Sequence, residues 1–419
     1  GDPAHNREVA PEGAWAGAGW HCQGEFKNHL GTMISPRHFV TARHLGLKPQ
    51  DTTFVHRTFF SGEIADRTYH INPNANGGTG YWDIAGTDLR VFEVYGDFPA
   101  YAPLYSKSDE AGREVVMMGR GRPRGAEVTK SGQTRGWLWG PHDRKARWGV
   151  NRVDAIESHS AVGDLLVTDF DAAPGTEECH AAHGDSGGAL FIRDGGTWKL
   201  AGIFYAVDGR YDTNSTCGDA SDFEAAMFDA SQFFVGSDSE GCDGWELAGH
   251  LEDTLQSRAF ASRISSSTGL LQPITQPAID DAAKTPRERY DDWISGFGSG
   301  LKGLPGEDAD RDGWANVLEY FAALDPTAVD QPRRPFLVED AGETIRFTVR
   351  VRLDASARGL SWEIHATDDL VNQTYLPVTG LMQAGLARSL TEGVSTWQYE
   401  IAKPAGSRMF YRLEVTLAP

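Results

Sequence analysis

The segment HGDSGGALF contains what nucleophilic catalysis by a hydroxyl group requires. Ser186 stands among glycines, and such small neighbours let a carbonyl group come close to the backbone. The N–H groups of Gly184 and Ser186 could then donate hydrogen bonds to an oxyanion that forms on that carbonyl. A hydroxyl is a weak nucleophile, so this chemistry also needs a base and an acid that orients the base.

Candidates for the base and the acid lie earlier in the chain. His44 ends the segment GTMISPRHFVTARH, and Asp88 opens the alternating apolar run DLRVFEV. Asp83, in WDIAG, is the rival acid, but the Gly-Thr pair after Ala85 interrupts any strand that begins at Asp83. The sequence therefore favours His44 as base, Asp88 as acid and Ser186 as nucleophile.

These motifs resemble the chymotrypsin and trypsin family, which carries its nucleophile in GDSGG and its base after a strand ending in TAAH. Asp88 follows His44 by 44 residues and Ser186 follows Asp88 by 98, close to the family's intervals. The resemblance covers roughly residues 15–235. It implies an all-β, chymotrypsin-like double β-barrel with the site in the cleft between the barrels. It also implies a secreted serine endopeptidase that acts on protein or peptide substrates through an acyl-enzyme.

Two other functions fit the same residues. A catalytically silent relative could serve in binding, with the C-terminal region providing adhesion, although an intact set of three residues argues against lost activity. The same triad also supports ester hydrolysis.

The resemblance further assigns the substrate pocket. His180 takes the position of the pocket floor, with Ala181 and Tyr205 beside it. No acidic residue stands at the floor, which disfavours cleavage after Arg or Lys and leaves acidic or polar side chains as the alternative. The start GDPAHNRE is unlike the apolar N-terminus that pairs with the acid before the nucleophile, here Asp185. An internal basic residue serves Asp185, or the mature N-terminus lies elsewhere.

The cysteines favour disulfides over a metal site. None has CxxC spacing, and an even, scattered set is typical of an exported protein. By the resemblance, the pocket would be bracketed by a Cys179–Cys217 bridge, leaving Cys22 to pair with Cys242. Other pairings stay open.

Charge and hydropathy exclude several partners. The formal net charge of -20 disfavours nucleic acid and anionic membrane surfaces. No apolar run approaches the roughly 18 residues needed to cross a bilayer. Residues 1–13 contain no apolar targeting core, so we expect an extracellular or periplasmic protein whose signal peptide has been removed.

Composition and periodicity suggest four segments. Residues 1–262 form the peptidase domain, because short apolar runs alternate there with Gly, Pro, Asn and Asp. Residues 263–286, rich in Ser, Thr and Pro, read as a linker. A short helix–loop–helix is expected over 287–330 and a small β-sandwich over 331–419. The role of the sandwich stays open between cell-surface or polymer binding, secretion and stabilisation.

The acidic loop DADRDGWANVLE has the pattern of an EF-hand calcium loop, with Gly313 at its sixth position. Neighbouring carboxylates repel one another without a cation. A single loop indicates structural Ca²⁺ and not a calcium sensor, and catalysis needs no cofactor. The loop resembles calcium loops near the C-termini of exported bacterial proteins. The expected ligands are Asp308, Asp310, Asp312, the Trp314 carbonyl and a bidentate Glu319.

Overall fold

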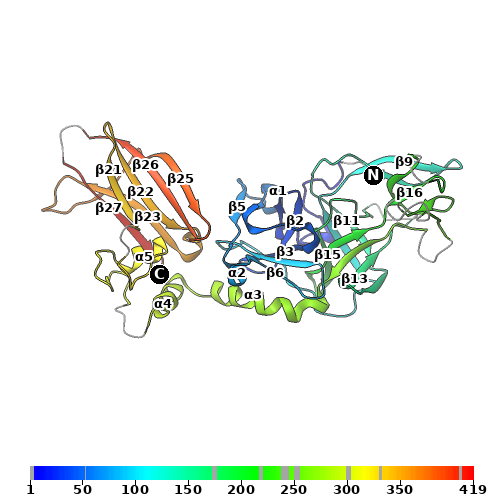
Figure 1. The fold of residues 1–419 in the computed structure, drawn as a ribbon, viewed down its shortest axis with the longest axis horizontal. Helices are drawn as coiled ribbons and strands as arrows, with labels where there is room; N and C mark the ends of the chain where they lie inside the picture. Colours follow the sequence, from blue (N-terminus) through cyan, green and yellow to red (C-terminus); the bar gives the residue numbers. More distant parts are fainter. Residues whose placement is uncertain are drawn as a thin grey trace. The chain divides into compact units, whose positions relative to one another are not determined.

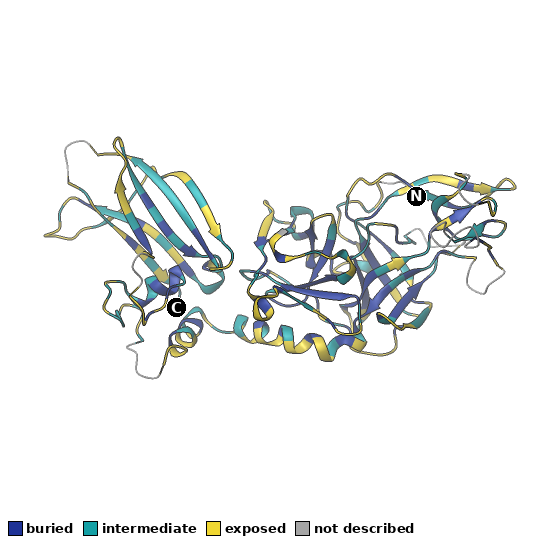
Figure 2. Cartoon of the chain, in the orientation of Figure 1, coloured by how far each residue is buried: buried dark blue, intermediate teal, exposed yellow. Residues whose placement is uncertain are grey.

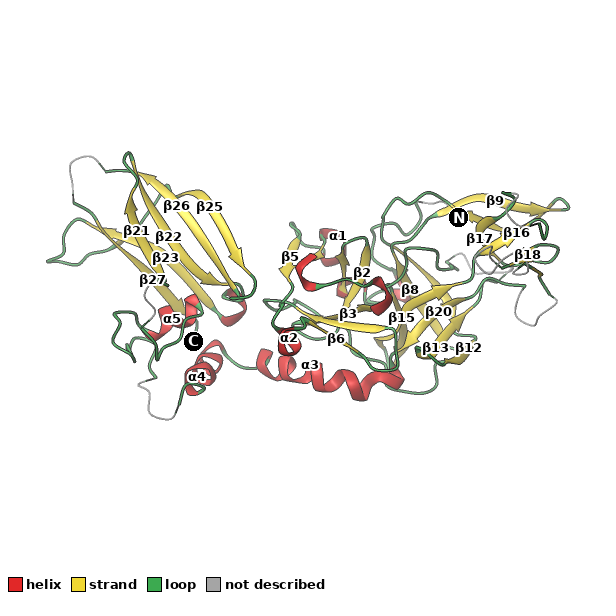
Figure 3. Cartoon of the chain, viewed as in Figure 1, coloured by secondary structure: helices red, strands yellow, loops and turns green. Residues whose placement is uncertain are grey.

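The computed structural model divides the chain into two units. The described residues are 4–51, 53–171, 177–216, 220–236, 245–249, 255–298, 303–329, 333–404 and 408–419. Antiparallel strands make up most of both units (Figure 3). The first unit comprises Gly1–Ile71, Ala75–Glu93 and Phe98–Gln276, and the second Asn72–Asn74, Val94–Asp97 and Pro277–Pro419.

Seven of the described strands form the first sheet of the first unit (Figure 1). Their order across the sheet is β5 (Arg67–His70), β4 (Thr53–His56), β1 (Gln23–Phe26), β2 (His29–Met33), β3 (His38–Ala42), β7 (Leu89–Glu93) and β6 (Tyr81–Asp83). Strand β3 is buried along its whole length, and Phe39, Val91 and Phe92 are fully buried. Aromatic and β-branched residues pack well on a pleated surface, so β3 and β7 form a firm base for the loops at their ends.

Two more antiparallel sheets complete the first unit. One contains β11 (Arg147–Arg152), β8 (Glu114–Gly119), β14 (Ala189–Asp194), β15 (Thr197–Val207), β20 (Ala259–Arg263), β13 (Gly163–Thr168) and β12 (Ala155–His159). The other contains β19 (Glu246–Leu247), β18 (Phe234–Val235), β16 (Arg210–Asp212), β17 (Phe223–Met227), β10 (Gln133–Trp139) and β9 (Arg124–Lys130). Short helices α1 (Thr58–Ser61) and α2 (Ala75–Gly78) lie in loops of the first sheet.

The segment predicted as a linker is largely helical, which corrects that prediction. Helix α3 (Thr268–Ala282) follows β20 closely, and the division between the two units falls inside it, after Gln276. Its buried residues are spaced as on one face of a helix, but most of them are small or polar. The sequence therefore shows no apolar stripe that would have predicted the helix. In the described part of the chain no helix is long and apolar enough to cross a membrane. The buried positions of α3 are Leu271, Thr275 and Ala278.

The second unit contains two antiparallel sheets and two helices. The four-stranded sheet has β21 (Phe336–Asp340), β22 (Thr344–Arg352), β26 (Val394–Ala402) and β25 (Met382–Ser389), and the other has β24 (Leu376–Pro377), β23 (Leu360–Thr367) and β27 (Phe410–Leu417). Along β22, buried residues alternate with more exposed ones, as the sequence predicted (Figure 2).

The helices of this unit match the predicted positions and share the core of the sheets. Helix α4 (Pro286–Ser295) starts with a reciprocal cap between Thr285 and Glu288, whose side chains accept each other's main-chain N–H. Helix α5 (Asn316–Ala322) follows the acidic loop. Tyr290, Phe321 and Phe347 belong to one hydrophobic cluster, so the helix–loop–helix and the sandwich fold around a common core.

Candidate active site

The pairing of β3 with β7 brings His44 and Asp88 together. Ala42 at the end of β3 lies opposite Leu89 at the start of β7. His44 therefore follows one strand and Asp88 precedes the other at the same end of the ladder. The main-chain N–H of His44 donates to Asp88 Oδ1 at 2.9 Å, and His44 Nδ1 lies 2.6 Å from Asp88 Oδ2. The carboxylate thus holds both the backbone and the ring of His44.

Ser186 reaches this pair through a turn that only glycine can follow. Gly187 has a φ of +85°, and a Cβ there would lie 2.3 Å from Thr41 Oγ1. A Cβ on Gly188 would lie 2.2 Å from the Met118 carbonyl oxygen. The two glycines after the serine are therefore required by close backbone approach and, at Gly187, by a left-handed conformation.

The three side chains form one hydrogen-bonded chain. Ser186 Oγ lies 2.9 Å from His44 Nε2, on the far side of the ring from Asp88. An ionised carboxylate only accepts, so His44 Nδ1 donates to Asp88, and His44 Nε2 is left to accept the serine proton. The Asp88 side chain is 3% exposed and that of His44 37% exposed, so the acid is shielded while the base faces the solvent.

The rival acid is engaged elsewhere. Arg90 donates from Nε to Asp83 Oδ1 at 2.6 Å and from a terminal nitrogen to Asp83 Oδ2 at 2.9 Å. This two-point pairing occupies both oxygens of Asp83. Of the two acids weighed from the sequence, the structure brings Asp88 to His44.

The loop before Ser186 presents main-chain donors. Gly184 has a φ of +97°, which turns the backbone sharply just before the nucleophile. Within the described residues, the N–H groups of Gly184 and Ser186 donate to no other protein group. They are available to a substrate oxygen, as the sequence predicted for an oxyanion site.

Asp185 is held by main-chain donors. Its Oδ1 accepts the N–H of Gly121 at 2.6 Å and its Oδ2 accepts the N–H of Ala182 at 2.8 Å. Burial raises the pKa of Asp185 to about 6, although these N–H groups favour the charged form. Across the described residues no basic side chain forms an ion pair with Asp185. The Arg147 guanidinium also favours the charged form, so an internal basic residue acts on Asp185 at longer range than an ion pair.

Comparison with family models agrees with this geometry. Residues 14–219 match the model described as Trypsin. This match identifies residues 14–219 as a trypsin-like serine peptidase domain. A search of curated proteins gave no significant match. The antiparallel sheets of this trypsin-family unit are consistent with the predicted chymotrypsin-like β-barrel fold.

Two cavities lie next to the loop that carries Ser186, and Ala181, Ala182 and Asp185 line both. A cleft of about 290 Å³ is lined by His44, Ser186, Ala181 and Tyr205. The Tyr205 ring meets the His44 ring edge-on at 5.8 Å. The predicted pocket residues Ala181 and Tyr205 thus do lie beside the nucleophile.

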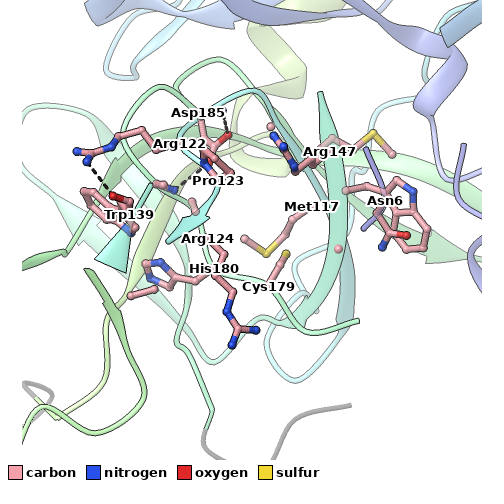
Figure 4. Close-up of a pocket in the computed structure, with 18 of the residues that line it drawn as sticks. Asn6, Met117, Arg122, Pro123, Arg124, Trp139, Arg147, Cys179, His180 and Asp185 are labelled. Atoms are coloured by element: carbon pink, nitrogen blue, oxygen red, sulfur yellow. Dashed lines mark hydrogen bonds between the residues drawn. The ribbon is translucent and has the colours of Figure 1, made fainter. Parts of the chain in front are cut away.

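Of these two cavities, His180 lines the one without Ser186, and its place at the floor of the substrate pocket stays a prediction. This second cavity measures about 300 Å³. Figure 4 shows Met117, Cys179 and His180 on its walls and Asp185 at its upper end. The His180 ring packs against Phe170 at 5.7 Å. Ala181 lines both cavities, whereas His180 lines only the second of the two.

Sequence reasoning missed a second histidine beside the nucleophile loop. His29, on β2, faces the main chain of Gly184 and Ser186. Burial lowers the pKa of His29, and the nearby His44 ring lowers it further. His29 and Leu45 occupy positions where many trypsin-family members have a disulfide. Leu45 here packs against the core and would contact a Cβ on Gly187 at 3.4 Å.

The hypothesised disulfides find no support. Cys22 and Cys179 carry free thiols. Cys217 and Cys242, their expected partners, lie outside the described residues. Burial raises the pKa of Cys22 to about 12 and raises that of Cys179 as well, so both thiols stay protonated and unreactive at neutral pH.

The acidic loop gathers three of the predicted calcium ligands. Carboxylate oxygens of Asp308, Asp310 and Asp312 lie within 4.8 Å of one another. Glu319, on α5, is fully buried but lies outside this group. Trp314 donates its N–H to Asp312 Oδ1 at 2.9 Å, which closes the turn.

Proposed function

We propose that the chain is a serine endopeptidase in which Ser186 is the nucleophile, His44 the general base and Asp88 the group that orients the base. The proposal is carried by the hydrogen-bonded chain from Asp88 through His44 to Ser186, with contacts of 2.6 and 2.9 Å. The match of residues 14–219 to the Trypsin model supports the same reaction class.

The geometry accounts for each chemical step. Ser186 Oγ attacks the scissile carbonyl carbon while His44 Nε2 takes its proton. Asp88 stabilises the imidazolium that forms, and the N–H groups of Gly184 and Ser186 stabilise the oxyanion. His44 then gives the proton to the leaving amine as the acyl-enzyme forms. Water, activated by His44, hydrolyses that ester and restores the serine.

Labelling with a fluorophosphonate probe tests the assembled site. We expect mass spectrometry to find the label on the Ser186 peptide, and we expect it to disappear in Ser186→Ala and His44→Ala. Ser106→Ala, which removes an exposed hydroxyl of the same unit, is the matched control and should be labelled fully. An unlabelled wild-type protein, or a label on another residue, would contradict the proposal.

We also propose that the acidic loop holds a structural Ca²⁺. Asp308, Asp310 and Asp312 provide the clustered hard oxygen donors that Ca²⁺ prefers. Asp310 Oδ2 is buried without a hydrogen-bond partner, and burial raises the pKa of Asp310. Both features fit a carboxylate placed to meet a cation, with the Trp314 carbonyl and Glu319 as the further ligands expected from the loop pattern. The cation would neutralise the loop and fasten it to α5.

Calorimetry tests the calcium site in the full chain. We expect wild-type protein to bind one Ca²⁺ and to gain thermal stability over protein in a chelator, whereas Asp310→Asn should do neither. At a calcium concentration 100 times Kd the gain would be about 2.7 kcal/mol. Glu339→Gln, an exposed charge removal in the same unit, should behave as wild type. No heat of binding at millimolar calcium would end this proposal.

The proposed place of action is outside the cytoplasm, with the sandwich as a module that binds a cell surface or polymer. Support comes from the resemblance to exported proteins and from the separate core of the second unit. Fractionation of producing cells, with antibody against the second unit, tests the location. Recovery of the protein only in the cytoplasm would contradict it.

A further inference from the structure

One part of the cleft beside Ser186 is walled by small and apolar side chains, while His44, His183 and Asp185 line the rest with Ser186 and Tyr205. Ala181 and Ala182 come from the catalytic loop, and Ala206 and Val207 from the end of β15. Phe204 lies behind them and is 4% exposed. Alanines at three wall positions leave space next to the nucleophile, and their methyl groups offer no hydrogen bond to a guest.

The acids next to this wall already have hydrogen-bond or ion-pair partners in the protein. Asp185 contributes to the cleft, but its carboxylate accepts the N–H groups of Gly121 and Ala182 and lies at the end of the second cavity (Figure 4). Asp208, next to Val207, pairs with Arg258 at 3.0 Å. None of these carboxylates is left to receive a cationic substrate side chain.

His183, which also lines the cleft, already has an acidic partner. His183 Nδ1 lies 3.0 Å from Glu224, which also pairs with Arg122. Glu224 therefore already engages the Nδ1 side of His183. His180 cannot supply a cation either, because burial lowers its pKa to about 4 and it faces the second cavity. Among the described residues that line the cleft there is no Arg or Lys to pair with an acidic substrate side chain.

From this lining we propose that the cleft selects substrates with an uncharged apolar side chain, such as Leu, Met or Phe, on the residue whose carbonyl is attacked. The inference rests on the proposed peptidase function and names its substrate class. A charged side chain in the cleft would lose water without gaining a partner, whereas an apolar one is favoured by burial against the alanines and Val207. This differs from the acidic or polar preference left open by the residue types alone.

Fluorogenic peptides that differ only at that residue test the inference, with active sites counted by fluorophosphonate titration. We expect kcat/KM for Leu, Met and Phe to exceed that for Lys, Arg, Asp and Glu by about 100-fold or more. Labelled enzyme that prefers any charged residue would overturn the inference alone. Enzyme that neither labels nor cleaves any peptide would overturn the proposed function as well.

A charge placed on the cleft wall gives a second test. Ala206 is exposed, so Ala206→Asp should fold, and Ala206→Asn is its uncharged control of nearly the same shape. We expect the ratio of kcat/KM for Lys over Leu to rise at least about tenfold in Ala206→Asp and to stay low in Ala206→Asn. Because rates are divided by titrated sites, loss of folded protein does not alter the ratio. An unchanged ratio in Ala206→Asp would show that this wall does not contact the side chain and would overturn the inference.

Discussion

The two candidate sites of this molecule are built in opposite ways. The Ser186 site joins three segments separated by 44 and 98 residues, and strand pairing and glycine turns hold its groups within hydrogen-bond distance. The acidic loop packs three carboxylates into five consecutive residues, where like charges repel. The first site is organised by the fold, while we propose that the second is completed by a cation. The following predictions test that contrast.

The largest expected effect concerns the acid that orients His44. Asp88→Asn should lower kcat about 10⁴-fold, because an amide in place of the carboxylate favours the wrong imidazole tautomer and cannot stabilise the imidazolium. Asp83→Asn, which affects only the pair with Arg90, should retain activity within a few-fold. Peptide hydrolysis rates per folded molecule measure both. Equal losses in the two variants would mean that Asp88 acts only through stability.

A pair of glycines gives the next largest effect. Gly187→Ala would place a Cβ 2.3 Å from Thr41 Oγ1 at a φ of +85°, while Gly313→Ala meets nothing within 4 Å at a φ of +99°. We expect overpacking and strain together to cost about 2–5 kcal/mol at Gly187, and strain alone about 1–2 kcal/mol at Gly313. Denaturant unfolding in a chelator measures each free energy of unfolding. A larger loss at Gly313 would reverse the contrast between a packed site and an open loop.

The smallest effect concerns a second group of acids, in the first unit. Burial, together with the neighbouring Asp154 and Asp171, raises the pKa of Asp169 to about 6. The charged form is thus disfavoured in the folded protein, and this penalty is absent below pH 4 and complete above pH 6. Wild-type stability should therefore fall across this window more steeply than that of Asp169→Asn. Urea midpoints measure the slopes, with exposed Asp222→Asn as control, and parallel slopes in all three proteins would refute the prediction.

Residue types and order predicted the chemistry of the Ser186 site, because nucleophile, base and acid each sit in a recognisable local motif. The relation between the motifs depends on which residues pair across β3 and β7, and no local pattern encodes that register. The surroundings of His180 could not be predicted for a related reason. Its ring packs against Phe170, a residue outside the motif around Ser186.

Sequence periodicity predicted a strand correctly where the buried residues are also the hydrophobic ones. The alternation from Ile345 to Val351 identified β22 because every second residue there is large and apolar. Helix α3 was not predicted because Thr275 and Ala278 are buried without being strongly hydrophobic. His29 was missed as a neighbour of the nucleophile because a histidine in a strand gives no sign of which distant loop it will contact.

Because Ala42 lies opposite Leu89, activity at Ser186 also reports whether β3 and β7 have paired in the native register. A shift of one residue between β3 and β7 would displace Asp88 from His44 by about 3.3 Å and turn every side chain of one strand to the other face. A misregistered barrel could keep most of its backbone hydrogen bonds and its compactness, yet Ser186 would have no assembled partner. Turnover, or covalent capture of Ser186, therefore counts molecules whose strands have found the native alignment, a property that circular dichroism or size alone would not distinguish.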